Sequence, residues 1–149
     1  MNQTKISVIM PSLNVSKYIK QCLQSVLNQT LEDIEIICVD GGSTDGTLDI
    51  IQQYVKKDNR VKLIHSDIKS YGYQMNLGIK EASGDYIGIV ETDDYIQSDM
   101  YERLYDVVVG NPEEEIDFVK GSYNQIAECK GKVICLPFTR DFDKSMLNR

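Results

Sequence analysis

Three carboxylates stand within four residues in the segment Glu91-Thr92-Asp93-Asp94, directly after an apolar run. At the mouth of a buried strand, these like charges repel one another unless water, protons or a cation neutralise them. Proteins hold Mg²⁺ or Mn²⁺ through one or two carboxylates while the phosphates of a substrate fill other positions. The segment therefore predicts a metal site that recruits a diphosphate. The alternative is a solvated loop with an aspartate that caps a helix.

Two other polar segments also follow apolar runs: Pro11-Ser12-Leu13-Asn14 and Asp40-Gly41-Gly42-Ser43. In the second, the glycines let a ligand approach the backbone, and Asp40 can accept hydrogen bonds from a base or a ribose. The alternative is an ordinary strand-to-helix turn. The segment is not a P-loop, because no Gly-Lys-Ser/Thr follows, and its glycine spacing also differs from the dinucleotide fingerprint.

Single residues between these segments are weaker candidates. Lys69 can meet a phosphate, although a surface lysine usually meets only water. Tyr71 and Tyr73 can stack on a base or sugar, or simply pack their loop. His65 is the only histidine. Because a lone histidine is more often packed than catalytic, we assign it no role.

Alternating apolar runs and helical patterns predict the framework that positions these residues. Continuous apolar runs, as found in parallel strands covered on both faces, predict strands over 6–10, 34–39, 61–64 and 86–90. Apolar residues at helical spacing predict helices over 15–27, around 48–55, over 73–82 and over 100–108. We expect Ser43 or Thr44 to cap the second helix, residues 110–112 to end the fourth, and a further strand over 116–119.

The predicted fold class is α/β, with a mostly parallel sheet and helices on both faces. In such a sheet, right-handed crossovers bring the carboxyl ends of all strands to one edge, where ligands bind. The candidate segments all follow strands, so we expect them to share one rim. We assign residues 1–127 to this domain.

Composition and charge narrow the possible partners. The 149 residues, 42% of them hydrophobic, suffice for one domain with a core. A net charge of −7 argues against a nucleic-acid partner. Neither a secretory pattern nor an apolar run near the roughly 18 residues of a membrane span is present, so we expect a cytoplasmic protein. We expect reduced thiols because no C-x-x-C spacing occurs among Cys22, Cys38, Cys129 and Cys135.

The order of these motifs resembles the family 2 glycosyltransferases with the GT-A fold. The similarity extends over about residues 6–104 and rests on the motifs SVIMPSLN, CLQSVLNQT, ICVDGGSTDGT, NLGI and SGDYIGIVETDD. The resemblance implies a Rossmann-like nucleotide-binding domain and inverting transfer from a sugar nucleotide, with a UDP-sugar as the expected donor. The implied acceptor is a hydroxyl group of a saccharide or a lipid-linked molecule in cell-surface polysaccharide synthesis.

The resemblance also implies a Mn²⁺ or Mg²⁺ cofactor, with Asp93 at the metal-binding end of the D-x-D motif and with Glu91 and Asp94 as further candidate ligands. This sequence departs from the family where Leu13, Gly41, Met75 and Glu91 replace the more frequent Tyr, Asp, Arg and Asp. Residue chemistry and resemblance together select these candidates for binding the nucleotide sugar: Pro11, Ser12, Leu13, Asn14, Asp40, Gly41, Lys69, Asn76, Glu91 and Thr92.

An inverting transferase also needs a carboxylate base that deprotonates the acceptor. By resemblance, that base follows the matched region, so we expect it beyond Arg149 and expect residues 128–149 to begin an incomplete acceptor-side region. The chain alone is then expected to bind a donor without efficient transfer. A membrane-linked acceptor would bring it peripherally to the inner membrane face. The alternatives are a nucleotide-sugar-binding module without transfer activity and a nucleotidyl- or phosphotransferase on a similar sheet.

Overall fold

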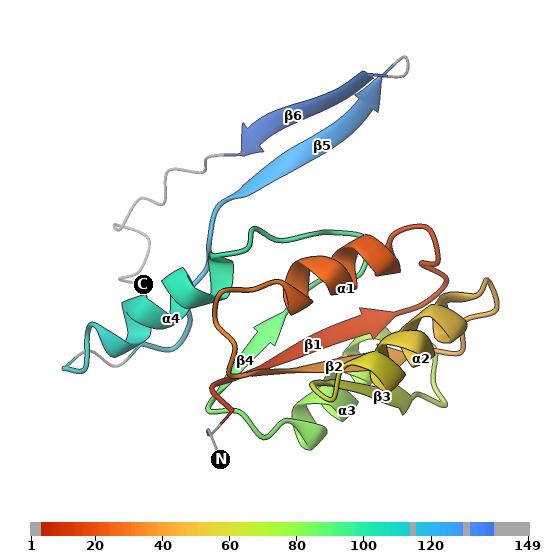
Figure 1. The fold of residues 1–149 in the computed structure, drawn as a ribbon, viewed down its shortest axis with the longest axis horizontal. Coiled ribbons are helices and arrows are strands. Elements are labelled where there is room, and N and C mark those ends of the chain that lie inside the picture. Colours follow the sequence, from red (N-terminus) through yellow and green to blue (C-terminus); the bar gives the residue numbers. More distant parts are fainter. Residues whose placement is uncertain (1–3, 114–115, 130–131, 139–149) are drawn as a thin grey trace. The chain divides into compact units, whose positions relative to one another are not determined.

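A computed structural model describes residues 4–113, 116–129 and 132–138. The chain divides into two compact units, Met1–Arg103 and Leu104–Arg149. Along the first unit, strands alternate with helices (Figure 1): β1 (Ile6–Ser12), α1 (Ile19–Leu27), β2 (Ile34–Asp40), α2 (Thr47–Lys57), β3 (Val61–His65), α3 (Tyr71–Glu81), β4 (Tyr86–Ile89) and the beginning of α4 (Met100–Val109).

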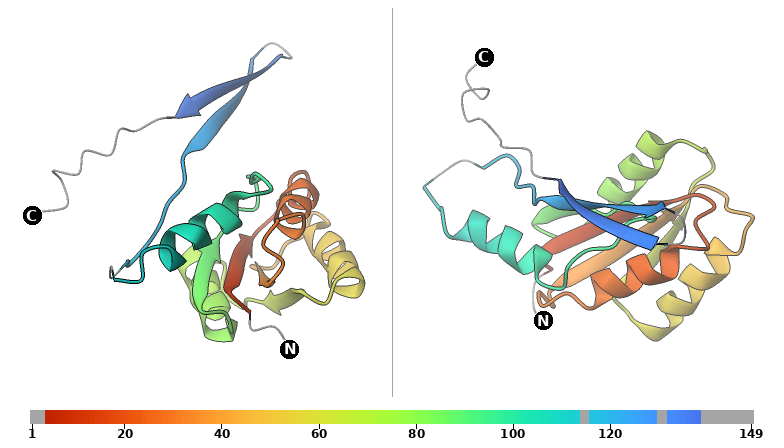
Figure 2. Two further views of the ribbon diagram at one scale, coloured as in Figure 1. Left: turned by 60° about the vertical axis from the view of Figure 1, so that its left-hand side comes forward. Right: turned by 90° about the horizontal axis from the view of Figure 1, so that it is seen from above.

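The four strands form one parallel sheet in the order β3-β2-β1-β4. Their register pairs Ile6 with Ile34 at one end of the two central strands and Ser12 with Asp40 at the other. Helices α1 and α2 lie against one face of the sheet and α3 against the other (Figure 2). The predicted α/β class, with a parallel sheet covered on both faces, is confirmed.

The core lies along the central strands. Every residue of β1 and β2 is buried, as expected for strands with a neighbour on each side and helices on both faces. Helix α1 contributes one buried stripe, formed by Ile19, Cys22, Leu23 and Val26. Strand β4 is different, because Ile87 and Ile89 are exposed although their run is apolar. Among the described strands it pairs only with β1, so it stands at an edge of the sheet.

Helix α2 begins after Gly46, whose backbone is left-handed with φ of 94°. The predicted caps Ser43 and Thr44 were wrong. Instead, the Asp45 carboxylate accepts hydrogen bonds from the Thr47 backbone N–H and hydroxyl, at 3.0 and 2.6 Å. An aspartate serves this end of the helix well, because its negative charge meets unpaired backbone donors.

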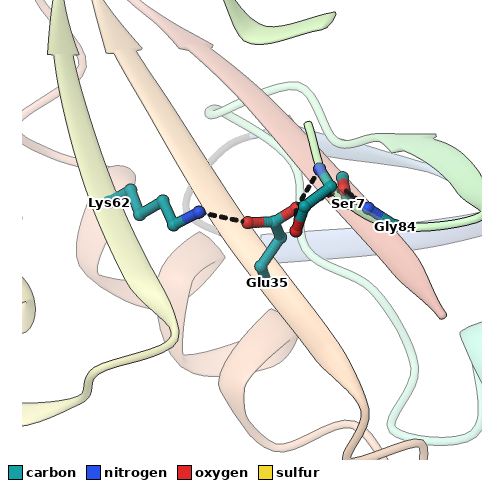
Figure 3. A network of polar contacts seen from close by, with 5 residues as sticks. Ser7, Glu35, Lys62 and Gly84 are labelled. Carbon is teal, nitrogen blue, oxygen red and sulfur yellow. Dashed lines mark hydrogen bonds and ion pairs between the residues drawn. The ribbon is translucent and has the colours of Figure 1, made fainter. Parts of the chain in front are cut away.

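A buried polar network joins three strands at the amino-end edge of the sheet (Figure 3). Glu35 on β2 is only 5% exposed and accepts hydrogen bonds from Ser7 Oγ at 2.5 Å and Lys62 Nζ at 2.6 Å. It also accepts bonds from the backbone N–H and the hydroxyl of Ser83, at 2.6 and 2.8 Å. Ser7 Oγ in turn accepts a bond from Gly84 N at 2.8 Å. The network fixes the turn before β4 against β1 and β2.

The second unit contains the rest of α4, which ends before Gly110 as predicted, and an antiparallel hairpin of β5 (Tyr123–Cys129) and β6 (Lys132–Phe138). The strand expected over 116–119 was wrong, since these residues have no regular structure. Phe118 in this run is 72% exposed, so the run lacks the burial that favours a strand. Of the acceptor-side region expected at 128–149, residues 128–129 and 132–138 lie in this hairpin, and residues 130–131 and 139–149 lie outside the described residues.

Two general predictions can be compared with this structure. Cys22 and Cys38 are free and buried, in agreement with reduced thiols, whereas the side chains of Cys129 and Cys135 lie outside the described part. No helix within the described ranges is long and apolar enough to span a membrane.

Candidate functional site

Segments that are distant in the sequence meet at the carboxyl ends of the strands. Gly41 N, just beyond β2, donates to Ser12 O at the end of β1 over 2.9 Å. On the other side of β1, Thr92 Oγ1 donates to Pro11 O over 2.9 Å. The structure thus brings the segments after β1, β2 and β4 to one rim, where an α/β sheet offers a ligand site.

Asn14 joins the loop after β1 to the loop after β2. Its backbone is left-handed, with φ of 54°, a conformation that Asn tolerates better than most residues. This conformation lets Asn14 N donate to Ser43 Oγ while Asn14 Oδ1 accepts from Thr44 N, each over 2.9 Å. Asn14, a predicted ligand residue, therefore has its side-chain oxygen engaged in loop structure.

Asp45 reinforces the same junction. Besides capping α2, its carboxylate accepts a 2.9 Å bond from Ser16 N in the loop after β1. The side-chain bond from Thr47 and the backbone bond from Ser16 hold the pKa of Asp45 well below its usual range. Thr47 Oγ1 also accepts a 2.9 Å bond from Val15 N. These hydrogen bonds therefore hold the loops after β1 and β2 together along one side of the rim.

Asp40 is the buried carboxylate of the rim, with 2% of its surface exposed. Its Oδ2 accepts bonds from Gly42 N and Ser43 N at 2.9 and 3.0 Å. Its Oδ1 is buried without a hydrogen-bond partner in the described structure. A buried acceptor without a partner is unfavourable, and a ligand N–H or O–H would satisfy it.

The acidic segment after β4 forms a tight turn, closed by a 3.0 Å bond from Asp94 N to Glu91 O. Thr92 is buried at 4% exposure and anchors the turn through Pro11 O, whereas the three carboxylate residues are exposed. Thr92 therefore anchors the centre of the turn to β1, while the acidic residues on either side of it are exposed.

Negative charge accumulates around this turn. Burial and then the charge of Asp93 raise the pKa of the Asp94 carboxyl. Burial, followed by the charges of Asp94, Asp93 and Glu91, raises the pKa of the Cys22 thiol to about 12. None of the ion pairs found between described residues involves these three carboxylates. The turn therefore concentrates three carboxylates that have no ion-pair partner among the described residues, and a cation would offset their repulsion.

The turn alone is not a complete metal cage. In the described part of the chain, no three His, Cys, Asp or Glu side chains are arranged to hold a metal ion together. Mg²⁺ and Mn²⁺ can bind through few protein carboxylates, because a phosphate ligand and water supply their other oxygens. The donor set therefore fits such an ion only when a ligand completes it.

Helix α3 supplies two side chains to the rim. The Tyr71 hydroxyl donates a 2.6 Å bond to Glu91 Oε1, and this bond, with burial and the charge of Glu91, raises the pKa of Tyr71 to about 12. Gln74 is 4% exposed, and its Nε2 donates to Ser12 O over 3.3 Å. Gln74 is not among the predicted site residues. The sequence offers little to select it: Gln74 is a polar residue on the same buried side of α3 as Met75 and Gly78.

The remaining predicted residues differ in their positions. Lys69 extends beside the loop after β2, because its Cε would lie 3.7 Å from a side-chain carbon added at Gly42. Leu13 is 40% exposed at the rim. Asn76 is exposed on α3, and its side chain has no hydrogen bond to another described residue. The structure thus places Lys69 beside the glycine loop, and it shows no hydrogen bond between the Asn76 side chain and the described residues of the rim.

Comparison with known proteins identifies the family. The model of glycosyl transferase family 2 matches residues 7–132. Glycosyltransferase GlyG of Streptococcus pneumoniae is 39% identical over 138 residues, which are 92% of this chain and 45% of GlyG. The poly(ribitol-phosphate) beta-glucosyltransferase of Bacillus spizizenii is 47% identical over 105 residues, which are 68% of this chain and 17% of that enzyme.

A solved structure supports the same assignment. S. aureus TarS 1-349 in complex with UDP-GlcNAc superposes with a TM-score of 0.62 and 35% identity, covering 73% of this chain and 31% of the TarS 1-349 chain. The chain thus spans less than half the length of these relatives. Because the family model covers most of the chain and the parallel sheet has its expected GT-A architecture, this chain belongs to glycosyl transferase family 2.

Proposed function

We propose that this chain is the donor-binding part of a glycosyltransferase that moves a sugar from a UDP-sugar to a hydroxyl acceptor. One observation carries the proposal: the buried, unpartnered Oδ1 of Asp40 and the uncompensated acidic turn at 91–94 lie along the same rim. A nucleoside diphosphate with a divalent cation has groups that satisfy both features, since its base or ribose donates hydrogen bonds and its metal carries positive charge.

The nature of the donor is supported by a relative above 30% identity. TarS 1-349, which is 33% and 35% identical to this chain in two crystal structures, was solved with UDP and with UDP-GlcNAc. We place the nucleoside against Asp40 and the backbone of Pro11 and Ser12. The glycine loop and Lys69 then face the diphosphate, where small side chains and a positive charge favour phosphate binding.

Mg²⁺ or Mn²⁺ is the proposed cofactor. When bound, the ion would neutralise charge that develops on the departing nucleoside diphosphate. Asp93 is the principal proposed ligand, because it is exposed on the turn and its carboxylate makes no hydrogen bond to another described residue. Glu91, which Tyr71 holds at Oε1, and Asp94 are the further candidate ligands.

The transfer is proposed to invert the anomeric carbon, and such a transfer requires a carboxylate base that deprotonates the acceptor hydroxyl. We propose a saccharide or lipid-linked acceptor and a role in cell-surface polymer synthesis. The Bacillus spizizenii relative, named for glucosyl transfer to poly(ribitol phosphate), supports an acceptor of this kind. A lipid-linked acceptor would bring the chain to the inner membrane face.

Calorimetric titration of UDP, GDP and CMP with and without Mn²⁺ tests the donor site. We expect UDP to bind tightly only with Mn²⁺, and Asp93→Asn to weaken that binding at least about tenfold. Glu81→Gln is the matched control, because it removes one negative charge at the far end of α3. Circular dichroism melting should show both variants folded. UDP binding that needs no metal, or an Asp93→Asn variant with parental affinity, would refute the assignment.

A further inference from the structure

The side-chain amide of Gln74 fills the space at the rim that a side chain at position 41 would occupy. A side-chain carbon added at Gly41 would collide with Gln74 Nε2 and would lie 3.3 Å from Gln74 Cδ. It would also lie 3.5 Å from Ser12 O, the acceptor of the Gln74 amide bond. The missing side chain at position 41 is therefore what allows the amide of Gln74 to enter between the ends of β1 and β2.

The amide stands beside the buried carboxylate of Asp40. Gly41 directly follows Asp40, and Ser12 is the register partner of Asp40 in the sheet. A glutamine amide carries two N–H donors, and the bond to Ser12 O uses one of them. Around Gly41 and Ser12, Gln74 Nε2 therefore keeps one N–H without a partner, and Asp40 Oδ1 is an acceptor without a partner.

We propose that Gln74 determines which base the nucleotide site accepts. Asp40 Oδ1 accepts a ring N–H, and the second N–H of the Gln74 amide donates to the ring carbonyl beside it. Together they select a base that presents a –CO–NH– edge, as uracil and guanine do. Cytosine is disfavoured because its ring nitrogen at that edge is an acceptor and would leave Asp40 Oδ1 without a donor. This inference rests on the proposed function, since it requires a nucleotide at this rim.

The test is calorimetric titration of UDP, CDP and GDP into the parent and Gln74→Met at saturating Mn²⁺. Methionine keeps the length and volume of the side chain but has no amide. We expect the parent to prefer UDP over CDP by about tenfold or more, and Gln74→Met to lose about tenfold in UDP affinity with less than about a twofold change for CDP. A purely structural role would weaken both ligands equally.

The outcomes separate the two proposals. If the parent binds no nucleoside diphosphate with Mn²⁺, the proposed function fails and this inference fails with it. If the parent binds UDP but does not distinguish it from CDP, or if Gln74→Met keeps the parental ratio, the role of Gln74 is overturned while the donor site stands. A parent that prefers GDP over both pyrimidine ligands supports the role of Gln74 and corrects the donor.

Gly41→Ala provides an independent variant. Position 41 has no positive φ, so alanine is not strained there, and its methyl group would displace only the flexible end of Gln74. We expect this variant to melt like the parent and to lose the UDP preference, as Gln74→Met does. In a Gln74→Ala background the same change should have no further effect on the ratio. A Gly41→Ala chain with parental UDP preference would contradict the proposal.

Discussion

The hydroxyl of Tyr71 donates a 2.6 Å hydrogen bond to Oε1 of Glu91, so the first residue of α3 is tied to the acidic turn after β4. This contact distinguishes the carboxylates of the turn. Glu91 has one oxygen held by the protein, whereas the Asp93 carboxylate makes no hydrogen bond to a described residue. The orientation of Glu91 therefore depends on α3, and Asp93 is left available for a cation.

Tyr71→Phe should weaken Mn²⁺-dependent UDP binding by about tenfold, because a group that orients a metal-site carboxylate commonly contributes this much. Folding should change little, since Tyr71 is 52% exposed. Calorimetry at fixed Mn²⁺ and a melting curve measure the two effects separately. Tyr73→Phe is the matched control, because it removes a hydroxyl from the same turn of α3 without removing a bond to Glu91. Equal affinities of the two variants would show that Tyr71 does not position the acidic turn.

Glu35→Gln should lower the free energy of unfolding at pH 7 and should make that free energy depend less on pH in the acidic range. Burial opposes ionisation of Glu35, but bonds from Lys62, Ser7 and Ser83 outweigh it and lower the pKa to about 2. Since the folded-state pKa is lower than the unfolded one, this stabilisation is complete above about pH 4.5 and is lost as the pH falls toward 2. The loss at pH 7 should be on the order of 2–3 kcal/mol.

Urea unfolding of the parent and Glu35→Gln at several pH values between 7 and about 2.5 measures this difference. The two curves should converge at the acidic end. Lys62→Met is the control: the Lys62 side chain is 51% exposed, so we expect a loss of about 0–1 kcal/mol at pH 7. A constant difference between parent and Glu35→Gln at all pH values would mean that Glu35 does not titrate with folding.

The central sheet was predictable because burial on both faces leaves continuous apolar runs in β1 and β2. The edge position of β4 was not, since Ile87 and Ile89 look the same in sequence whether covered or exposed. The caps expected from Ser43 and Thr44 failed because α2 begins only at Thr47, after Gly46, and Ser43 Oγ instead accepts a bond from Asn14 N, about thirty positions away.

The acidic turn could be found from sequence because its residues are contiguous. Gln74 could not, because its place at the rim depends on the missing side chain at Gly41 and on an acceptor at Ser12. This arrangement involves α3, β1 and the loop after β2, so no short stretch of sequence contains a pattern that predicts it. Helical periodicity places Gln74 on α3 but does not show which polar group its amide meets.

Asn14→Ala should destabilise the chain by about 1–2 kcal/mol, and Asn14→Gly should do so by about 1 kcal/mol less. Both changes remove the acceptor of Thr44 N, so the lost hydrogen bond is common to them. Only alanine is strained by the left-handed backbone, whose φ is 54°. Urea unfolding at pH 7 measures the difference. Equal stabilities would show that the conformation of this loop is not strained in the folded chain.

Thr92→Val isolates the anchor of the acidic turn, because valine has nearly the same shape as threonine and lacks only the hydroxyl. The lost bond to Pro11 O is buried, so we expect a decrease of about 1 kcal/mol in the free energy of unfolding. Mn²⁺-dependent UDP affinity should fall as well, by about threefold to tenfold, since the carboxylates on either side of Thr92 then lose their fixed backbone.

Thr44→Val is the control, because the Thr44 hydroxyl is exposed and its backbone N–H makes the bond to Asn14. That variant should stay within about 0.5 kcal/mol of the parent. A Thr92→Val chain that melts earlier but binds UDP like the parent would separate the stability of the turn from its function, and the turn would then owe its geometry to the Asp94–Glu91 backbone bond instead.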